Sequence, residues 1–457
     1  MPEKNEDISV VARELDAKGV SKTYLSYIPS FVLSITFDFI ALAIDALLLA
    51  HLLGSTALSV DTRIVPVYCW IMLVMNLFSG VHIYMSRIFA ENDKHKINSV
   101  FTLAFYLVLL LTVITAVIAL NTTAILCFFD SSLTQTDYLL RLGHRYLQGL
   151  VWGFFPMFAI TSLDYMVRID GSKYLPVVAG ISYIVCNTVL DLWLIGKFRY
   201  FGAGIATSIS YWVNFLIMST HFLKKNNSYK LVKFKMTDVS IKDIFSLSCP
   251  KLAHHIAILL RVTCLTILGF RNFGAVFGTV NSIYVKTSDF LDILILGVVD
   301  ASSPLIGIAY GRKDYKTLRK ILHAMHRFAL PSVGILCLSI FIFPQIFPLI
   351  MNVHTYDEAF IPTCKAVQMM AIDSAIYVIY YIYDRYYQQI GYEKFISVLE
   401  FCRSTLFVIP LYYLLSGYDN GNGYWWADII KELIILAIVL ALHFWQSRKL
   451  RKIYGKN

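Results

Sequence analysis

The stretch SRIFAENDKHKINSV (residues 86–100) is matched 221 positions later by GIAYGRKDYKTLRKI (residues 307–321), which places Asp93 on Asp314. Two further matches share this offset, because Pro29 falls on Pro250 and Gly202 on Gly423. At offset 220, LLGSTALSV (52–60) lies over NFGAVFGTV (272–280). Several matches in the same order at almost one offset indicate an internal duplication.

Composition indicates that the duplicated unit is built from membrane-spanning segments. The chain has 457 residues, of which 57% are hydrophobic and only 15% charged, and its mean hydropathy is +0.63. A soluble domain carries about 25% charged residues. We therefore predict an all-α polytopic membrane protein. Apolar runs near the roughly 20 residues that a bilayer requires recur as twelve predicted spans: 25–50, 60–86, 98–120, 145–168, 175–196, 202–223, 247–269, 277–309, 320–350, 361–385, 395–415 and 424–446.

The duplication divides these spans into six and six. Each repeat has an even number of spans, so both copies have the same orientation in the membrane. We predict a cytoplasmic leader (1–24), an N-terminal lobe (25–223), a basic linker (224–246), a C-terminal lobe (247–446) and a basic tail (447–457). Two six-helix lobes that face a cleft can alternate access by rocking, which is typical of transporters.

The net charge of +10 at first suggests a nucleic-acid partner, but its distribution favours another explanation. Lys and Arg gather in the termini and the even-numbered loops, as in KKNNSYKLVKFK (224–235). This is the positive-inside pattern, so we predict that both termini are cytoplasmic and that the protein crosses the cell (inner) membrane many times. The expected partners are the bilayer and a small organic substrate, with no nucleic acid, and we expect a monomer.

Polar residues inside the first repeat indicate a cation site. In CNTVLDLWLIG (186–196), Asn187 and Asp191 are four apart and share a helix face. Asp38 and Asp45 share a face of the first span, and Thr207 adds a hydroxyl in the sixth. These hard oxygen ligands suit a proton or Na⁺. The alternative is that they act as hydrogen-bonding contacts between helices.

The second repeat carries a different set of charges. In NSIYVKTSDFLDILILGVVD (281–300), Lys286, Asp289 and Asp292 follow one another at spacings of three. We expect an internal ion pair between Lys286 and Asp289. The alternative is that this cluster, or Asp38, contacts a charged or zwitterionic substrate or relays protons. Further intramembrane charges are Arg261, Asp300 and Asp373.

No motif of an enzyme occurs in the sequence: there is no P-loop, GxSxG, HExxH or GxGxxG after a strand. We therefore expect no enzymatic activity and no cofactor beyond a coupling cation. Without a nucleotide site, active transport must draw on an ion gradient.

Several stretches resemble the multidrug and toxic compound extrusion (MATE) family of the MOP flippase superfamily. They include YIPSF (27–31) with AIDALLLAHLLGSTALSV (43–60), SGVHIYMSRIFAENDKHK (79–96), and the run from MVRIDGSKYLP to FGAGIATSIS (166–210). SPLIGIAYGRKDYKTLRKIL (303–322) and CRSTLFVIPLYYLL (402–415) continue the likeness.

The resemblance implies two six-helix lobes and antiport of organic compounds against Na⁺ or H⁺. It also implies a cation site in the N-terminal lobe at Asp45, Asn187, Asp191 and Thr207. The sequence leaves Na⁺ and H⁺ open, because carboxylates serve either.

The leading hypothesis is a secondary antiporter that exports cationic or amphipathic compounds. A flippase of the same superfamily for lipid-linked saccharides is the nearest alternative. A transporter of the major facilitator type should carry a GxxxDrxGrr-like loop after the second span, which SRIFAENDKHK does not provide. A receptor or scaffold would not need acidic residues inside both halves.

Overall fold

The computed structural model describes residues 10–53, 56–91, 93–129, 138–224, 227–233, 239–351, 353–418 and 422–454. Within these ranges some helical side chains, including those of Asp38 and Asp45, lie outside the description. The regular structure of the described residues is helical, and no strand occurs among them. The chain divides into two compact units: unit 1 comprises residues 1–248 and 307–315, and unit 2 comprises residues 249–306 and 316–457.

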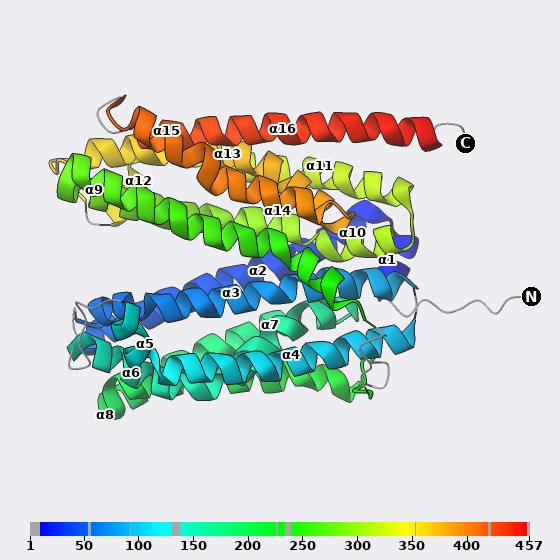
Figure 1. The fold of residues 1–457 in the computed structure, drawn as a ribbon, viewed down its shortest axis with the longest axis horizontal. Helices are drawn as coiled ribbons and strands as arrows, with labels where there is room; N and C mark the ends of the chain where they lie inside the picture. The colour runs from blue at the N-terminus through cyan, green and yellow to red at the C-terminus, as the bar shows by residue number, and fades with distance from the viewer. Residues whose placement is uncertain are drawn as a thin grey trace, which may run out of the picture. The chain divides into compact units, whose positions relative to one another are not determined.

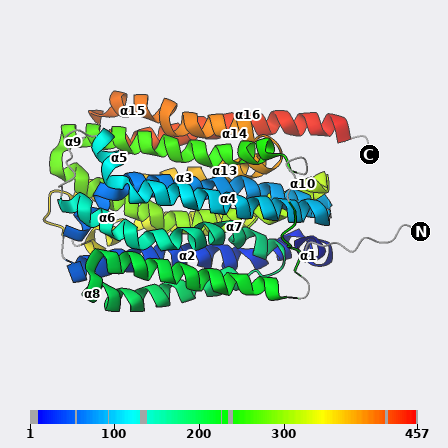
Figure 2. The same cartoon turned by 60° about the horizontal axis from the view of Figure 1, so that its bottom comes forward.

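Unit 1 is a bundle of long helices in which α4, α6, α7 and α8 run side by side (Figures 1 and 2). Its elements are α1 (Val10–Lys18), α2 (Val20–Leu53), α3 (Thr56–Glu91), α4 (Lys94–Leu120), α5 (Thr122–Phe129), α6 (Tyr138–Leu150), η1 (Val151–Gly153), α7 (Phe154–Ile169), α8 (Leu175–Ser219) and η2 (Thr220–Leu223).

Most of the second repeat lies in unit 2. Its elements are α9 (Ile241–Asp300), α10 (Ser303–Gly311), α11 (Tyr315–Ile342), α12 (Ile346–Ile350), α13 (Phe360–Gln389), α14 (Glu393–Phe401), the π-helical segment η3 (Cys402–Phe407), α15 (Val408–Leu415) and α16 (Gly423–Tyr454). The start of α9 and the end of α10 belong to unit 1.

Eight segments of the described residues are long and apolar enough to cross a membrane: Val67–Glu91, Lys94–Leu120, Tyr138–Ile169, Leu175–Leu223, Val276–Gly311, Tyr315–Ile342, Phe360–Gln389 and Glu393–Leu415. Leu175–Leu223 contains both the fifth and the sixth predicted spans. The helical class predicted from the sequence is confirmed, while the total of twelve spans stays a prediction.

Helix α8 folds back on itself at Arg199, whose φ of 52° and ψ of −129° are not helical. These angles are close to those of the first central residue of a type II′ turn, a position that costs a residue other than glycine about 1–3 kcal/mol. After the turn, a Cβ on Gly202 would collide with the carbonyl oxygen of Leu194. The two arms of α8 therefore pack closely in opposite directions, and the turn falls between the predicted spans 175–196 and 202–223.

Helix α9 also folds back. A straight helix of its 60 residues would be about 90 Å long. Instead, the ring of Phe277 lies where a Cβ on Gly269 would be. Farther from the bend, Arg261 and Tyr284 reach the same carboxylate, that of Asp428. One arm thus contains the predicted span 247–269 and the other begins near residue 277.

The two repeats use the same local contacts. The Gly202–Leu194 contact recurs 221 positions later between Gly423 and Leu415. In the same way Gly171, with φ 94°, ends α7, and Gly391, with φ 96°, follows the end of α13 at offset 220. Each of these glycines adopts the left-handed conformation that ends a helix at low steric cost. These matched turns support the duplication that the sequence indicates.

Helix α1 is held against unit 1 by both apolar and charged contacts. Val11 and Ala12 are buried, and the Glu14 carboxylate lies 2.5 Å from the Lys173 ammonium and 3.0 Å from that of Lys18. Burial alone would raise the pKa of the Glu14 carboxyl, but these two lysines outweigh burial and hold the pKa below its usual value. The leader predicted at 1–24 therefore contains a docked helix.

Candidate functional site

The cation-site residues predicted in unit 1 lie on α2 and on the two arms of α8. Helix α2 runs parallel to the first arm of α8, because Ser30 donates to the carbonyl of Lys173 and Phe37 contacts Gly180, and both pairs are 143 residues apart. Extending this register by two helical turns places the backbone of Asp45 level with residue 188, between Asn187 and Asp191. The side chain of Asp45 lies outside the described residues.

The second arm of α8 brings Thr207 to the same depth. The rings of Tyr183 and Tyr211, one on each arm, have centroids 4.8 Å apart. One turn nearer the bend from this contact lie Asn187 on the first arm and Thr207 on the second. The register therefore places Asn187 and Thr207 at one depth, with Asp191 one turn nearer the bend and the α2 backbone at Asp45 between the levels of Asn187 and Asp191.

These side chains are buried: Asp191 is 0%, Asn187 2% and Thr207 7% exposed. The Thr207 hydroxyl donates its proton to the Ala203 carbonyl at 3.0 Å, so its lone pairs remain available to accept or to coordinate. The Asn187 amide nitrogen has no hydrogen-bond partner among the described residues. Buried carboxylate, amide and hydroxyl oxygens form the ligand set that Na⁺ or a shared proton requires.

Asp38 does not share this depth. In the α2–α8 register it is level with residue 181, about 10 Å along the helix from Asp45 by the rise of seven residues. Its side chain also lies outside the described residues.

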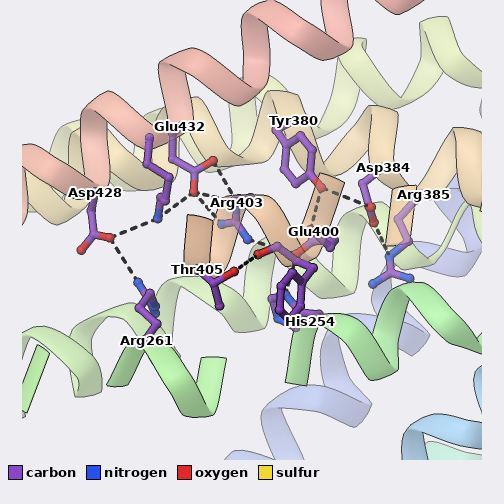
Figure 3. A network of polar contacts seen from close by, with 12 residues as sticks. His254, Arg261, Tyr380, Asp384, Arg385, Glu400, Arg403, Thr405, Asp428 and Glu432 are labelled. Atoms are coloured by element: carbon purple, nitrogen blue, oxygen red, sulfur yellow. Dashed lines mark hydrogen bonds and ion pairs between the residues drawn. The ribbon is translucent and has the colours of Figure 1, made fainter. Parts of the chain in front are cut away.

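Unit 2 contains a continuous chain of buried charges (Figure 3). His254 Nδ1 lies 2.8 Å from Glu400 Oε2, and Arg403 holds Glu432 through two nitrogens at 2.6 and 2.9 Å. A second contact of Arg403, to Glu400 at 3.5 Å, joins these two pairs. The chain therefore begins on α9 and crosses α14 and η3 to reach α16.

The same chain returns to α9 through α16. Lys431 Nζ lies 3.0 Å from Glu432 and 3.1 Å from Asp428, and Asp428 accepts from Arg261 Nη1 at 3.2 Å. Arg261 is seven residues from His254, on the same face of α9, so the charges close a ring across four elements. Asp428 and Glu432 are 1% and 0% exposed, which makes the network part of the interior of unit 2.

One of the buried charges lies in the π-helical segment η3. Such segments are rare and are frequently found at functional sites. Here η3 contains Arg403 and directly follows the helix that carries Glu400. The Arg403 guanidinium lies over the rings of Tyr377 and Tyr380, with distances of 4.5 and 5.2 Å to their centroids.

Sequence reasoning missed most of this network. A signal was present, because Glu400 and Arg403 are three apart, and Asp428, Lys431 and Glu432 are spaced by three and four. Opposite charges at those spacings inside apolar runs indicate buried pairing. Their partners on other spans were not predictable without the tertiary structure.

The ion pair expected between Lys286 and Asp289 is not formed: no hydrogen bond or ion pair joins these two described residues. Lys286 is exposed and Asp289 is half-buried. A lysine that precedes the acid on a helix is the less favourable order for such a pair, and an exposed ammonium is solvated without a partner. The expectation of internal pairing is therefore wrong for this cluster.

The two repeats differ at equivalent positions of their charged sites. Asp191 and Thr207 correspond, at offset 221, to Tyr412 and Asp428. In unit 2 these residues are bonded directly, with Tyr412 Oη 3.0 Å from Asp428 Oδ1. Asp428 also has two tethered cations, Arg261 and Lys431.

Comparison with solved structures defines the class of the fold. The chain matches a MATE in the bent conformation with a TM-score of 0.85 and 18% identity, over 97% of this chain and 99% of that one. An outward-facing multidrug resistance MATE transporter of the MOP superfamily matches at 0.83 and 18%, over 95% and 97%. A MOP superfamily transporter from Pyrococcus furiosus matches at 0.82 and 18%, over 95% and 97%. The fold is thus that of multi-pass membrane transporters.

The family follows from the sequence itself. The family model MatE matches residues 25–193 and 256–414, which is more than half of the chain. The chain therefore belongs to the MatE family and is a multi-pass membrane transporter, and the resemblance found in the sequence is confirmed. No curated protein sequence matches the chain.

Proposed function

We propose that this protein is a secondary active antiporter that exports organic cationic or amphipathic compounds in exchange for Na⁺ or H⁺ by alternating access. In each transport cycle the protein binds the coupling cation on one side of the membrane and releases it on the other. We place the protein in the cell membrane as a monomer with both termini in the cytoplasm.

The observation that carries the proposal is that the buried side chains of Asn187, Asp191 and Thr207 lie within one helical turn of one another in depth, next to the level of the α2 backbone at Asp45. A buried carboxylate inside a span costs a few kcal/mol, so such a residue is retained where it has a function. The Thr207 hydroxyl donates to the backbone and presents lone pairs, as a cation ligand must. We assign Asp45, Asn187, Asp191 and Thr207 to the coupling ion.

The charges of unit 2 favour this proposal over a flippase for lipid-linked saccharides. A flippase with an anionic cargo needs cations that are available to the cargo's phosphates. In unit 2, Arg403 and Lys431 are each paired with carboxylates and less than 10% exposed. They neutralise buried acids, and so they do not offer a cationic surface to a cargo.

Reconstitution tests the proposal. Full-length protein in proteoliposomes is loaded with the fluorescent cation tetramethylrhodamine methyl ester, and a Na⁺ gradient or a pH gradient is applied in turn. We expect one gradient to drive flux, and we expect Asp191→Asn to abolish it. Asp243→Asn, which neutralises an exposed carboxylate at the start of α9, is the matched control and should transport as the unmodified protein does.

Two results contradict the proposal. Flux that is equal in the presence and absence of both gradients shows a facilitator rather than an antiporter. Gradient-driven flux that persists in Asp191→Asn shows that the Asp191 carboxylate is not needed for coupling. The ion whose gradient drives flux in the unmodified protein is the coupling ion.

A further inference from the structure

A polar stripe on α2 runs from the level of the coupling site to the end of unit 1 that carries α1. It consists of Ser30, Ser34, Asp38 and Asp45, at spacings of four, four and seven. These spacings keep the four positions within about 80° of the helix circumference, at 3.6 residues per turn. Since α2 is one helix from Val20 to Leu53, the four backbone positions share a face over about 22 Å.

Arg168 closes the α2 stripe at the α1 end. Its guanidinium is 1% exposed, and its Nη1 donates to the Ser30 hydroxyl. Its Nη2 donates to Ser34 at 2.7 Å and to Asp164 at 2.9 Å, which places these two residues at one level. Nε completes a two-point contact with Asp164 at 3.0 Å. A tethered cation is therefore fixed where the stripe meets the end of the bundle.

The partner of this cation is the more accessible of the two. Asp164 lies four residues before Arg168, about 6 Å farther from the end of α7. Its side chain is nevertheless 35% exposed, against 1% for that of Arg168. Asp164 belongs to the candidate membrane span Tyr138–Ile169, and charges inside a span face the bundle interior or water rather than hydrocarbon. Its carboxylate therefore contacts water deeper in unit 1 than the guanidinium does.

Oxygen ligands continue inward from Asp164. Thr161, three residues earlier on α7, donates its hydroxyl proton to the Met157 carbonyl at 2.9 Å, so its lone pairs remain available. On α2, the next position of the stripe after Ser34 is Asp38. Because α7 and α2 run in opposite directions, Thr161 and Asp38 are each about one turn farther in. Carboxylate and hydroxyl oxygens are the ligands that small hard cations prefer.

We infer that the coupling cation passes between the cytoplasm and the coupling site along the α2 stripe, with Asp164 as a transient ligand and Arg168 as the residue that closes the path. This inference rests on the proposed function, which places the α1 end of unit 1 in the cytoplasm, and it adds the route of the ion. In this structure the guanidinium neutralises Asp164 and occupies the hydroxyls of the stripe. A passing cation takes the place of that guanidinium at the carboxylate.

Binding kinetics test the inference without transport. Full-length protein in nanodiscs is mixed rapidly with Na⁺, or is given a pH jump, in turn. Tryptophan fluorescence follows binding, since Trp193 lies two residues from Asp191 on α8. We expect Asp191→Asn to abolish the signal, which assigns it to the coupling site.

A group on the path and a group in the binding site give different kinetics. A group on the path changes the association and dissociation rate constants by the same factor, so that their ratio, the Kd, stays the same. Asp164 is level with Ser34, about 17 Å along α2 from Asp45. At that separation in water, one charge changes the affinity by less than about twofold.

The two charges have opposite expected effects. Asp164→Asn removes the attraction for the cation and leaves the guanidinium, still bonded to Ser30 and Ser34, uncompensated in the path. Both rate constants should fall about tenfold, the lower end of what focused charge contributes to association. Arg168→Gln opens the path and keeps the carboxylate, so both rate constants should rise. Glu91→Gln, which neutralises an exposed carboxylate at the end of α3 in the same unit, should change neither.

The inference is overturned if Asp164→Asn leaves both rate constants unchanged, or if it weakens the affinity as much as it slows association. Changes of the same sign in Asp164→Asn and Arg168→Gln also overturn it, because loss of structure affects both variants alike. If Arg168→Gln does not elute as a folded protein, Asp164→Asn decides by the first two criteria. No response of the unmodified protein to either cation overturns the inference together with the coupling site.

The path and the proposed antiport fail separately. Opposite rate changes in the two variants without gradient-driven flux in proteoliposomes refute antiport alone. Gradient-driven flux with rate constants that Asp164→Asn does not change refutes the path alone.

Discussion

Replacing Arg403 by methionine should destabilise unit 2 strongly. The guanidinium is 7% exposed and holds Glu432 through contacts of 2.6, 2.9 and 3.1 Å. Removing one partner of a buried ion pair costs about 3–5 kcal/mol, because an uncompensated charge stays behind. Glu432 retains Lys431, and Glu400 retains His254 and Tyr380. We therefore expect a loss near the lower end, about 3 kcal/mol in the free energy of unfolding.

The double variant Arg403→Met/Glu432→Gln distinguishes an ion pair from simple loss of packing. It removes both charges, so it should be more stable than Arg403→Met alone by about 1–2 kcal/mol. The assay is equilibrium unfolding in mixed detergent micelles, followed by circular dichroism and tryptophan fluorescence. Arg327→Gln, on an exposed surface, should stay within about 0.5 kcal/mol of the unmodified protein.

The reasoning is refuted by either of two results. The first is a loss in the free energy of unfolding for Arg403→Met as small as that of the Arg327→Gln control, which would show that the network does not stabilise unit 2. The second is a loss for the double variant equal to the sum of the losses of the two single variants, which would show that Arg403 and Glu432 contribute independently.

Two further predictions concern unit 1. Gly202→Ala should destabilise the fold by about 2 kcal/mol or more, because its methyl group collides with the rigid backbone at Leu194; Gly196→Ala, with nothing within 4 Å, should be neutral or stabilising in the same unfolding assay. Glu14→Gln should release α1 at neutral pH, seen as faster hydrogen exchange of residues 10–18. Since the folded-state pKa of Glu14 lies below its usual 4.5, its contribution of about 1 kcal/mol is present above pH 4.5 and lost as pH falls through the folded pKa. Exchange of α1 that does not change with acidification contradicts this account.

At positions related by the duplication, the two units carry different polar and charged residues. In unit 1 the pair is Asp191 and Thr207, both buried. In unit 2 the equivalent pair is Tyr412 and Asp428, and Asp428 is neutralised by cations that belong to the chain itself, Arg261 and Lys431.

The bends of α8 and α9 show which features the sequence predicts and which depend on the tertiary structure. The sequence predicts an interruption between 196 and 202 and another between 269 and 277. The first coincides with the turn at Arg199, and the second with the contact between Gly269 and Phe277. Apolar run length predicts such breaks because a span ends where the bilayer ends. The same reasoning does not predict that Arg199 adopts a positive φ.

What the sequence determined by itself was the helical class, the family, the duplication and the shared face of Asn187 and Asp191. These follow from composition, from motifs and from the period of one helix. Only the tertiary structure decided that Thr207 lies level with Asn187, that Lys286 is unpaired with Asp289, and that Arg403 binds Glu432. Whether these groups meet depends on the register between packed helices and on how well water solvates each charge. The spacing of residues along one helix determines neither of these.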